Sequence, residues 1–289
     1  MENRKILRYN KTVVILIMKI FLIRNEGYTS MDKIKIVFFD IDGTLVDMSH
    51  KRITPKTLEA LNRLKEKGIL ICIATGRAPI TLPRFDGITF DAFLTFNGSL
   101  CYNSTQDIFR NPIPSDDVKT IIQNAASIGR PVSVASRTAL AANGMEQDLI
   151  DYYSIVNLSV EISETFDQII ERDDIYQIML GCREDEYDAL LKNAPGARIT
   201  AWWDRAADII PAGGSKGIGI KKILEYYQIA PSEAMAFGDG NNDIEMIQTV
   251  GHGIAMANAS PELKAAACDV CGHAAEDGIY YYLKDRGLI

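Results

Sequence analysis

The stretch VFFDIDGTLVD, residues 37–47, decides how the rest of the sequence is interpreted. Its first part is an apolar run without alternating polar residues, which is typical of a strand buried on both faces of a parallel sheet. The run ends in two carboxylates, Asp40 and Asp42, one residue apart. Ligands of open parallel sheets bind outside the carboxyl ends of the strands, so this pair indicates a functional site.

Around this stretch, short apolar runs alternate with helical patterns. A strand over 35–40 precedes a helix that Thr54 and Pro55 would begin and Gly68 would end, and a second strand follows over 69–75. The alternation returns with a helix after Ser215, a strand over 234–239, a helix within 242–250, a short strand over 253–256 and a helix after Ser260. This pattern predicts an α/β fold, with a Rossmann-like parallel sheet as core and helices on both faces.

The middle of the chain follows another pattern. A helix is expected over 115–128, followed by strands over 131–136 and 138–143, further helices, and strands near 175–182 and 197–203. Neighbouring strands with separate helices indicate an inserted α+β module. We therefore expect a catalytic core in residues 31–111 and 208–289, and a cap domain in 112–207 that would close over the site and select the substrate.

Residues 1–30 combine a basic start with the apolar run TVVILIMKIFLI. Lys19 interrupts the run, no small-residue cleavage site follows, and a spanning helix needs about 20 apolar residues. A non-domain extension is the leading interpretation, with an interfacial anchor and a removed signal as alternatives. We expect no stable membrane insertion.

The composition excludes some classes of function. With 31 basic against 38 acidic residues, the net charge of −7 argues against a nucleic-acid binder. The five cysteines lack paired spacing, which suits a reducing compartment, and we expect a cytoplasmic protein. Nothing in the sequence indicates an oligomeric state.

Polar side chains converge where three predicted strands end. Asp40 and Asp42 follow the first; Thr75, Gly76 and Arg77 end and follow the second; Asp239, Asn242 and Asp243 follow the third; and Lys216 begins the helix before the third. Carboxylates and an ammonium at one sheet edge suit Mg²⁺ and a phosphoryl group, because Mg²⁺ prefers few carboxylates and keeps room for a phosphate oxygen.

The sequence matches two other functional motifs, the EF-hand loop and the phosphate-binding loop, only in part. An EF-hand loop needs Gly at its sixth position, where Leu45 and Ile244 stand after Asp40 and Asp239. GGSKG, residues 213–217, lacks the Ser or Thr that follows the lysine of a phosphate-binding loop. The same GGSKG also matches the GxSxG pattern of serine hydrolases, but the three histidines lie outside the predicted site.

The ordered motifs DIDGTL (40–45), ATGR (74–77), Lys216 and GDGNNDIEMI (238–247) resemble those of the haloacid dehalogenase-like hydrolases. The chain is most similar to the Cof-type phosphatases, whose large α/β cap lies between the second and third motifs. FNGSL (96–100), GIAMANASPELKAAA (253–267) and EDGI (276–279) fit that pattern too. The resemblance runs from Lys33 to the C-terminus.

This resemblance implies an Mg²⁺-dependent phosphatase for small phosphorylated metabolites, such as sugar phosphates or cofactor- or nucleotide-like monoesters. Asp40 would be the nucleophile that forms an aspartyl-phosphate, and Asp42 the general acid and base. The implied Mg²⁺ ligands are Asp40, the Asp42 carbonyl, Asp239 and Asp243. The implied phosphoryl contacts are Thr75, Gly76, Lys216 and Asn242. Arg77 would either touch the substrate or pair with a core carboxylate.

Two other functions stay open on the sequence alone. A phosphomutase uses the same aspartate pair, and exclusion of water by the cap would decide between hydrolysis and transfer. A non-catalytic phosphometabolite-binding protein would keep the site for binding only. For Trp202 and Trp203, adjacent on a strand, at most one could stack on a substrate ring.

Overall fold

The computed structural model describes residues 33–47, 52–155 and 158–289, and within these the side chain of Trp202 is left undescribed. The expectations for residues 1–30 therefore lie outside the described residues. Among the residues that are described, no helix is long and apolar enough to cross a membrane.

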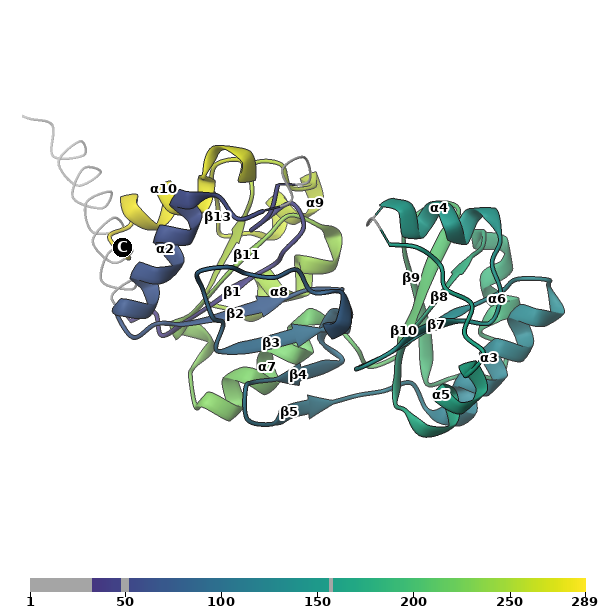
Figure 1. Ribbon diagram of the computed structural model, residues 1–289. Coiled ribbons are helices and arrows are strands. Elements are labelled where there is room, and N and C mark those ends of the chain that lie inside the picture. Colours follow the sequence, from purple (N-terminus) through teal and green to yellow (C-terminus); the bar gives the residue numbers. More distant parts are fainter. Residues whose placement is uncertain (1–32, 48–51, 156–157) are drawn as a thin grey trace, which may run out of the picture.

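The larger lobe is built around an eight-stranded sheet with the order β13-β12-β11-β1-β2-β3-β4-β5 (Figure 1). Its strands are β1 (Ile36–Phe39), β2 (Leu70–Ala74), β3 (Ala92–Thr95), β4 (Leu100–Tyr102), β5 (Asp107–Arg110), β11 (Ala234–Gly238), β12 (His252–Ala255) and β13 (Asp269–Val270). β1 pairs in parallel with β2 and β11. The predicted α/β class with a parallel core is thus confirmed.

The edge formed by β4 and β5 differs from the sequence analysis. These strands pair antiparallel with β3 and with each other, and neither was predicted. The chain reverses after β3 at Phe96–Gly98 and after β4 in a turn where the Asn103 side chain accepts hydrogen bonds from Thr105 and Gln106. Short hairpins of this kind leave little apolar periodicity to detect.

Helices cover both faces of the larger sheet (Figure 1). On one side α2 (Pro55–Glu66) contacts α10 (Gly278–Asp285), and on the other α7 (Lys216–Tyr227) contacts α8 (Ile244–Thr249), which contacts α9 (Pro261–Ala266). The predicted helix starts are confirmed, because the hydroxyls of Thr54, Ser215 and Ser260 each accept a backbone N–H of the first turn. Leu61 and Leu64 bury the inner face of α2.

The smaller lobe contains a five-stranded sheet with the order β7-β6-β8-β10-β9. Its elements are α3 (Ser115–Ser127), β6 (Ser133–Ser136), β7 (Leu140–Ala142), α4 (Gln147–Ile155), α5 (Phe166–Arg172), β8 (Ile175–Gly181), α6 (Tyr187–Leu190), β9 (Ala197–Trp203) and β10 (Ala206–Pro211). All of its strand pairs are antiparallel. The expected limit of the inserted module, between 207 and 208, falls inside β10, which the sequence analysis did not predict.

Candidate active site

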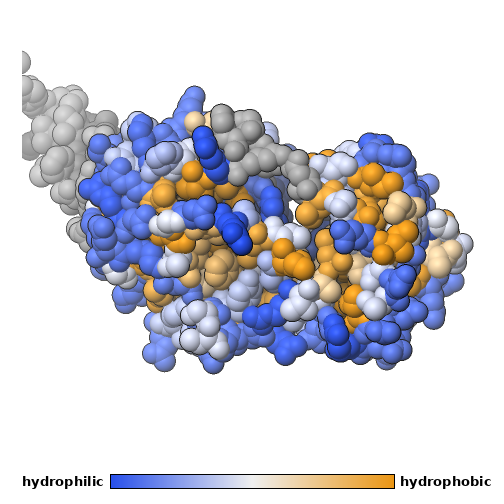
Figure 2. All heavy atoms as spheres, viewed as in Figure 1, coloured by the Kyte–Doolittle hydropathy of each residue, from blue (hydrophilic) through white to orange (hydrophobic). Residues whose placement is uncertain are grey.

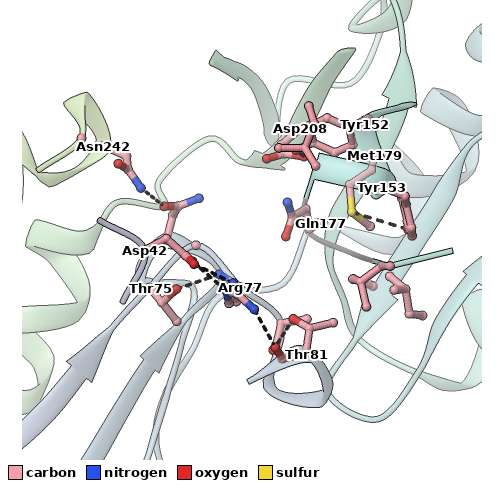
Figure 3. A pocket seen from close by; sticks show the side chains of 18 of the residues that line it. Asp42, Thr75, Arg77, Thr81, Tyr152, Tyr153, Gln177, Met179, Asp208 and Asn242 are labelled. Atoms are coloured by element: carbon pink, nitrogen blue, oxygen red, sulfur yellow. Dashed lines mark hydrogen bonds and ion pairs between the residues drawn. The ribbon is translucent and has the colours of Figure 1, made fainter. Parts of the chain in front are cut away.

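A cavity of about 450 Å³ lies between the two sheets. One side is formed by residues that end or follow β1, β2 and β11, and the other by the smaller lobe (Figure 3). In the space-filling view, apolar residues reach the surface on the facing sides of the two lobes (Figure 2). The polar sheet edge predicted from the sequence therefore forms one wall of the cavity, and the smaller lobe forms the other.

The loop after β1 brings two carboxylates close together. Gly43 has φ of +85°, and a Cβ at this position would lie 2.2 Å from Oδ2 of Asp239. Only glycine fits such a left-handed, crowded position without strain. The hydroxyl of Thr44 donates a hydrogen bond to Oδ1 of Asp239 over 3.0 Å. This loop fixes Asp239 beside Asp40.

Lys216 is the buried centre of the charge cluster. Its Nζ donates to Oδ1 of Asp40 over 2.7 Å and to Oδ1 of Asp243 over 2.6 Å, and the lysine is 1% exposed. Gly98, with φ of +93°, lets the start of α7 approach, since a Cβ there would lie 2.1 Å from the Ser215 carbonyl oxygen. The sequence-distant residues Asp40, Lys216 and Asp243 thus meet at one point.

Burial and mutual repulsion shape the electrostatics of the cluster. Burial raises the pKa of Asp40 well above its ordinary value; the Lys216 ammonium opposes this, and Asp243 and Asp239 add to it. Burial and then the charge of Asp243 raise the pKa of Asp239 to about 6. Burial would lower the pKa of Lys216, but the charges of Asp243 and Asp40 outweigh it and raise that pKa. The lysine therefore stays protonated.

The donor atoms at this point fit a hard divalent cation. One oxygen each of Asp40, Asp239 and Asp243 lies within 4.8 Å of the others. Three carboxylates facing one ammonium leave an excess of negative charge, which a bound cation would neutralise. Oxygen donors in such small numbers suit Mg²⁺, which keeps several of its waters.

Asp42 and Arg77 form a bidentate ion pair at the cavity (Figure 3). Nε of Arg77 donates to Oδ2 of Asp42 over 2.7 Å, and a terminal nitrogen donates to Oδ1 over 2.6 Å. The Thr75 hydroxyl accepts the backbone N–H of Arg77 over 3.2 Å. Of the two roles expected for Arg77, the structure contains the pairing with a carboxylate.

Asn242 meets a partner that the sequence analysis did not select. Its amide donates to Oδ1 of Asn97 over 3.0 Å, and both residues line the cavity. Asn97 adopts a left-handed backbone with φ of +52° in the turn after β3. Asn97 belongs to the motif FNGSL. It could have been recognised from the sequence as an asparagine directly before a glycine at the end of a strand.

All the predicted site residues lie at this place. The cavity is lined by Asp40, Asp42, Thr75, Gly76, Arg77, Asp239 and Asn242. Lys216 and Asp243 are buried and joined to Asp40 by the hydrogen bonds of Lys216. The arrangement combines a carboxylate held by an ammonium, a second carboxylate held by a guanidinium, and a place for a cation.

Comparison with known proteins identifies the family. The family model of haloacid dehalogenase-like hydrolases matches residues 37–283. This chain is a haloacid dehalogenase-like hydrolase. Enzymes of this superfamily generally use Mg²⁺, which agrees with the acidic cluster.

Several relatives of the hydrolase are named phosphatases. It is 34% identical over 256 residues to the putative phosphatase YkrA of Bacillus subtilis, which covers 88% of this chain and 98% of the relative. It is 26% identical over 270 residues to the 5-amino-6-(5-phospho-D-ribitylamino)uracil phosphatase YitU of Bacillus subtilis, covering 86% of this chain and 96% of that one.

A solved structure gives the same result. The hydrolase resembles a sugar phosphatase of subclass IIB of the superfamily with a TM-score of 0.77 and 31% identity, covering 88% of this chain and all of the other. The hydrolase is accordingly a phosphatase, and the resemblance to Cof-type enzymes is confirmed.

The smaller lobe contributes cavity residues that sequence reasoning missed. They are Ala135, Leu140, Tyr152, Tyr153, Ile155, Leu158, Gln177, Met179 and Asp208. Two of them could have been recognised from the sequence. Gln177 and Asp208 are polar residues inside otherwise apolar strands, IYQIMLG and AADIIP.

Proposed function

We propose that the enzyme is an Mg²⁺-dependent phosphatase that hydrolyses small phosphorylated metabolites through an aspartyl-phosphate on Asp40. The substrates we propose are sugar phosphates or cofactor- or nucleotide-like monoesters. One observation carries the proposal: the buried Lys216 ammonium bridges Asp40 and Asp243, and Asp40 and Asp239 line a cavity together with Asp42.

In the proposed first step, a carboxylate oxygen of Asp40 attacks phosphorus and the bond from phosphorus to the leaving oxygen breaks. Asp42, which must be protonated and released from Arg77 for this step, donates its proton to that oxygen. In the second step, the Asp42 carboxylate takes a proton from a water molecule that attacks the phosphorus of the aspartyl-phosphate. Inorganic phosphate leaves, and Asp40 is regenerated. The two carboxylates thus have separate tasks.

The remaining residues would bind and orient. Lys216 holds one oxygen of Asp40 and places positive charge beside the phosphoryl group. Thr75, the Gly76 backbone N–H and Asn242 would contact phosphoryl oxygens. Asp40, the Asp42 carbonyl, Asp239 and Asp243 would hold Mg²⁺. When bound, the ion offsets the repulsion between the anionic nucleophile and the anionic substrate.

Arg77 would position Asp42. A guanidinium that grips both carboxylate oxygens fixes the plane of the group, which a single point charge does not do. Residues 112–207 would act as the cap that covers the cavity and selects the leaving group. We also propose a reducing, cytoplasmic location, supported by five free cysteines, four of them buried.

The test is phosphate release from an aryl phosphate and a metabolite panel, with and without metal. We expect activity with Mg²⁺, its loss after treatment with a chelator, and its recovery when Mg²⁺ is restored. Asp40→Asn should lower turnover at least about 1000-fold while leaving the thermal unfolding curve intact. Turnover that survives complete chelation would refute the metal assignment, and a Asp40→Asn variant of near-wild-type rate would refute the nucleophile.

A further inference from the structure

The end of the cavity opposite Asp40 is built by the smaller sheet. Successive side chains of a strand point to opposite faces. Gln177 of β8 and Asp208 of β10 line the cavity, whereas Ile178 and Ile209 next to them belong to the apolar core of the smaller lobe. The two polar side chains therefore interrupt buried strands only on the cavity side.

Asp208 is the charged group of this surface. It is 6% exposed, and it accepts a hydrogen bond from the Tyr152 hydroxyl over 2.7 Å. The Gln177 amide lies close enough to lower the pKa of Asp208. Tyr152 and Gln177 line the cavity beside it (Figure 3). The neutral Tyr152 hydroxyl orients the carboxylate without neutralising its charge.

None of the described side chains that line this end of the cavity balances the charge of Asp208. Among the described cavity-lining residues of the smaller lobe there is no lysine or arginine, and Arg77 on the other side is paired with Asp42. A buried carboxylate without a cation costs free energy unless a ligand supplies one. This end of the cavity is therefore suited to donors of hydrogen bonds and positive charge, and it repels anions.

Apolar walls surround this acceptor. Leu140 and Met179 line the cavity, and Ile155 and Leu158 extend it outward with 40% and 38% of their surface exposed. Trp203 stacks on Tyr152, with ring centroids 6.5 Å apart and planes within 11°. Flat apolar surfaces around a small polar cluster favour a ring with an oriented polar substituent.

We propose that this surface is the leaving-group subsite, and that Asp208 selects phosphate monoesters whose leaving group carries an amino group on an uncharged or cationic ring. The amino N–H groups would donate to the carboxylate while the ring lies between the apolar walls. Leaving groups with a second phosphate or a carboxylate are excluded by charge. This inference rests on the proposed function, of which it specifies the substrate class.

The test compares matched substrates that differ in one group. Glucosamine 6-phosphate and glucose 6-phosphate differ by amino against hydroxyl, and cytidine and uridine 5′-monophosphate differ by amino against carbonyl. Fructose 1,6-bisphosphate supplies an anionic leaving group. Values of kcat/KM are measured with Mg²⁺ for the wild type, Asp208→Asn, and Asp188→Asn, whose side chain is exposed on α6. An aryl phosphate, whose leaving group has no amino group, shows whether the phosphoryl chemistry takes place.

We expect the wild type to prefer the amino member of at least one pair by about tenfold or more, because hydrogen bonds to charged groups are worth more than neutral ones. Fructose 1,6-bisphosphate should be the poorest substrate. Asp208→Asn should reduce the preference to about threefold or less. Asp188→Asn should behave like the wild type.

Two kinds of failure are distinguishable. If the wild type does not hydrolyse the aryl phosphate, the proposed function fails. If the aryl phosphate is hydrolysed but neither amino substrate is preferred, or the preference survives in Asp208→Asn, the subsite proposal is overturned. If Asp208→Asn does not fold, competitive inhibition of the wild type by cytidine and by uridine decides: equal inhibition contradicts the proposal.

Discussion

We expect the buried charge of Asp208 to lower the free energy of unfolding, and a single substitution can measure this effect. Burial raises its pKa to about 6 from an ordinary value of 3.8, and the hydrogen bond from Tyr152 and the neighbouring Gln177 amide oppose this only in part. The folded protein therefore holds the proton of Asp208 more tightly than the unfolded chain. As pH rises from about 4 to about 6, this group removes stability, because the unfolded state ionises first.

We predict that Asp208→Asn is more stable than the wild type at pH 7 to 8 by about 1–3 kcal/mol, and equally stable near pH 4. The titratable groups beside Asp208 are the phenols of Tyr152 and Tyr153 and the thiol of Cys182. Burial raises the pKa of Tyr153 and of Cys182, so neither of these two titrates in this range.

Denaturant unfolding at the two pH values measures the difference, with Asp188→Asn as the control that should change nothing. If Asp208→Asn were no more stable than the wild type at either pH, Asp208 would not be an uncompensated buried charge. A gain in stability together with the loss of substrate preference would instead identify a residue kept for function.

At the scale of elements, the turn after β1 is the most sensitive part of the site. Gly43 and Gly68 both have positive φ, +85° and +75°, but a Cβ at Gly43 would meet Asp239 at 2.2 Å, whereas Gly68 has nothing within 4 Å. A substitution would strain the backbone at both glycines, but only at Gly43 would the new side chain also clash with Asp239.

We predict that Gly68→Ala costs about 1–2 kcal/mol of unfolding free energy and leaves activity unchanged. Gly43→Ala should cost more, and it should raise the Mg²⁺ concentration for half-maximal activity by about tenfold or more, because Asp239 must move. Activity titrated against Mg²⁺ and thermal unfolding measure both effects. The same Mg²⁺ requirement in the two variants would contradict the role given to this turn.

Local signals made many of these elements predictable. Thr54, Ser215 and Ser260 stand at helix starts, where a hydroxyl can accept the first free N–H groups, and an unbroken apolar run marked β1. β10 was missed because its polar Asp208 interrupts a short strand. β4 and β5 were missed because their pairing depends on turns rather than on periodicity.

At the scale of the whole molecule, the parallel topology explains why the polar side of the cavity could be predicted. The carboxyl ends of neighbouring parallel strands meet at one edge, so Asp40, Thr75 and Asp239 had to lie close together once the strand order was known. The opposite side could not be predicted in this way. Which residues of the smaller lobe face Asp40 depends on how the two lobes meet, and local patterns mark only Gln177 and Asp208, as polar residues within apolar strands.

In the proposed mechanism the two lobes have separate tasks. The larger lobe would supply the groups for phosphoryl transfer, whereas Asp208, Gln177 and the apolar walls of the cavity come from the smaller lobe. With this division, changes in the smaller lobe would alter the choice of substrate while the chemistry at Asp40 stays the same. The proposed mechanism therefore depends on a covalent bond between Asp40 and phosphorus.

The most direct test of that bond is chemical trapping. Asp42→Asn, which lacks the base for the second step, is mixed with Mg²⁺ and an aryl phosphate whose leaving group needs no protonation, and the reaction is quenched with borohydride. An acyl phosphate is reduced to an alcohol, so peptide mass spectrometry should find residue 40 converted to homoserine in proportion to the burst of released phenol. A burst with residue 40 unmodified, or with the alcohol at another carboxylate, would contradict the account.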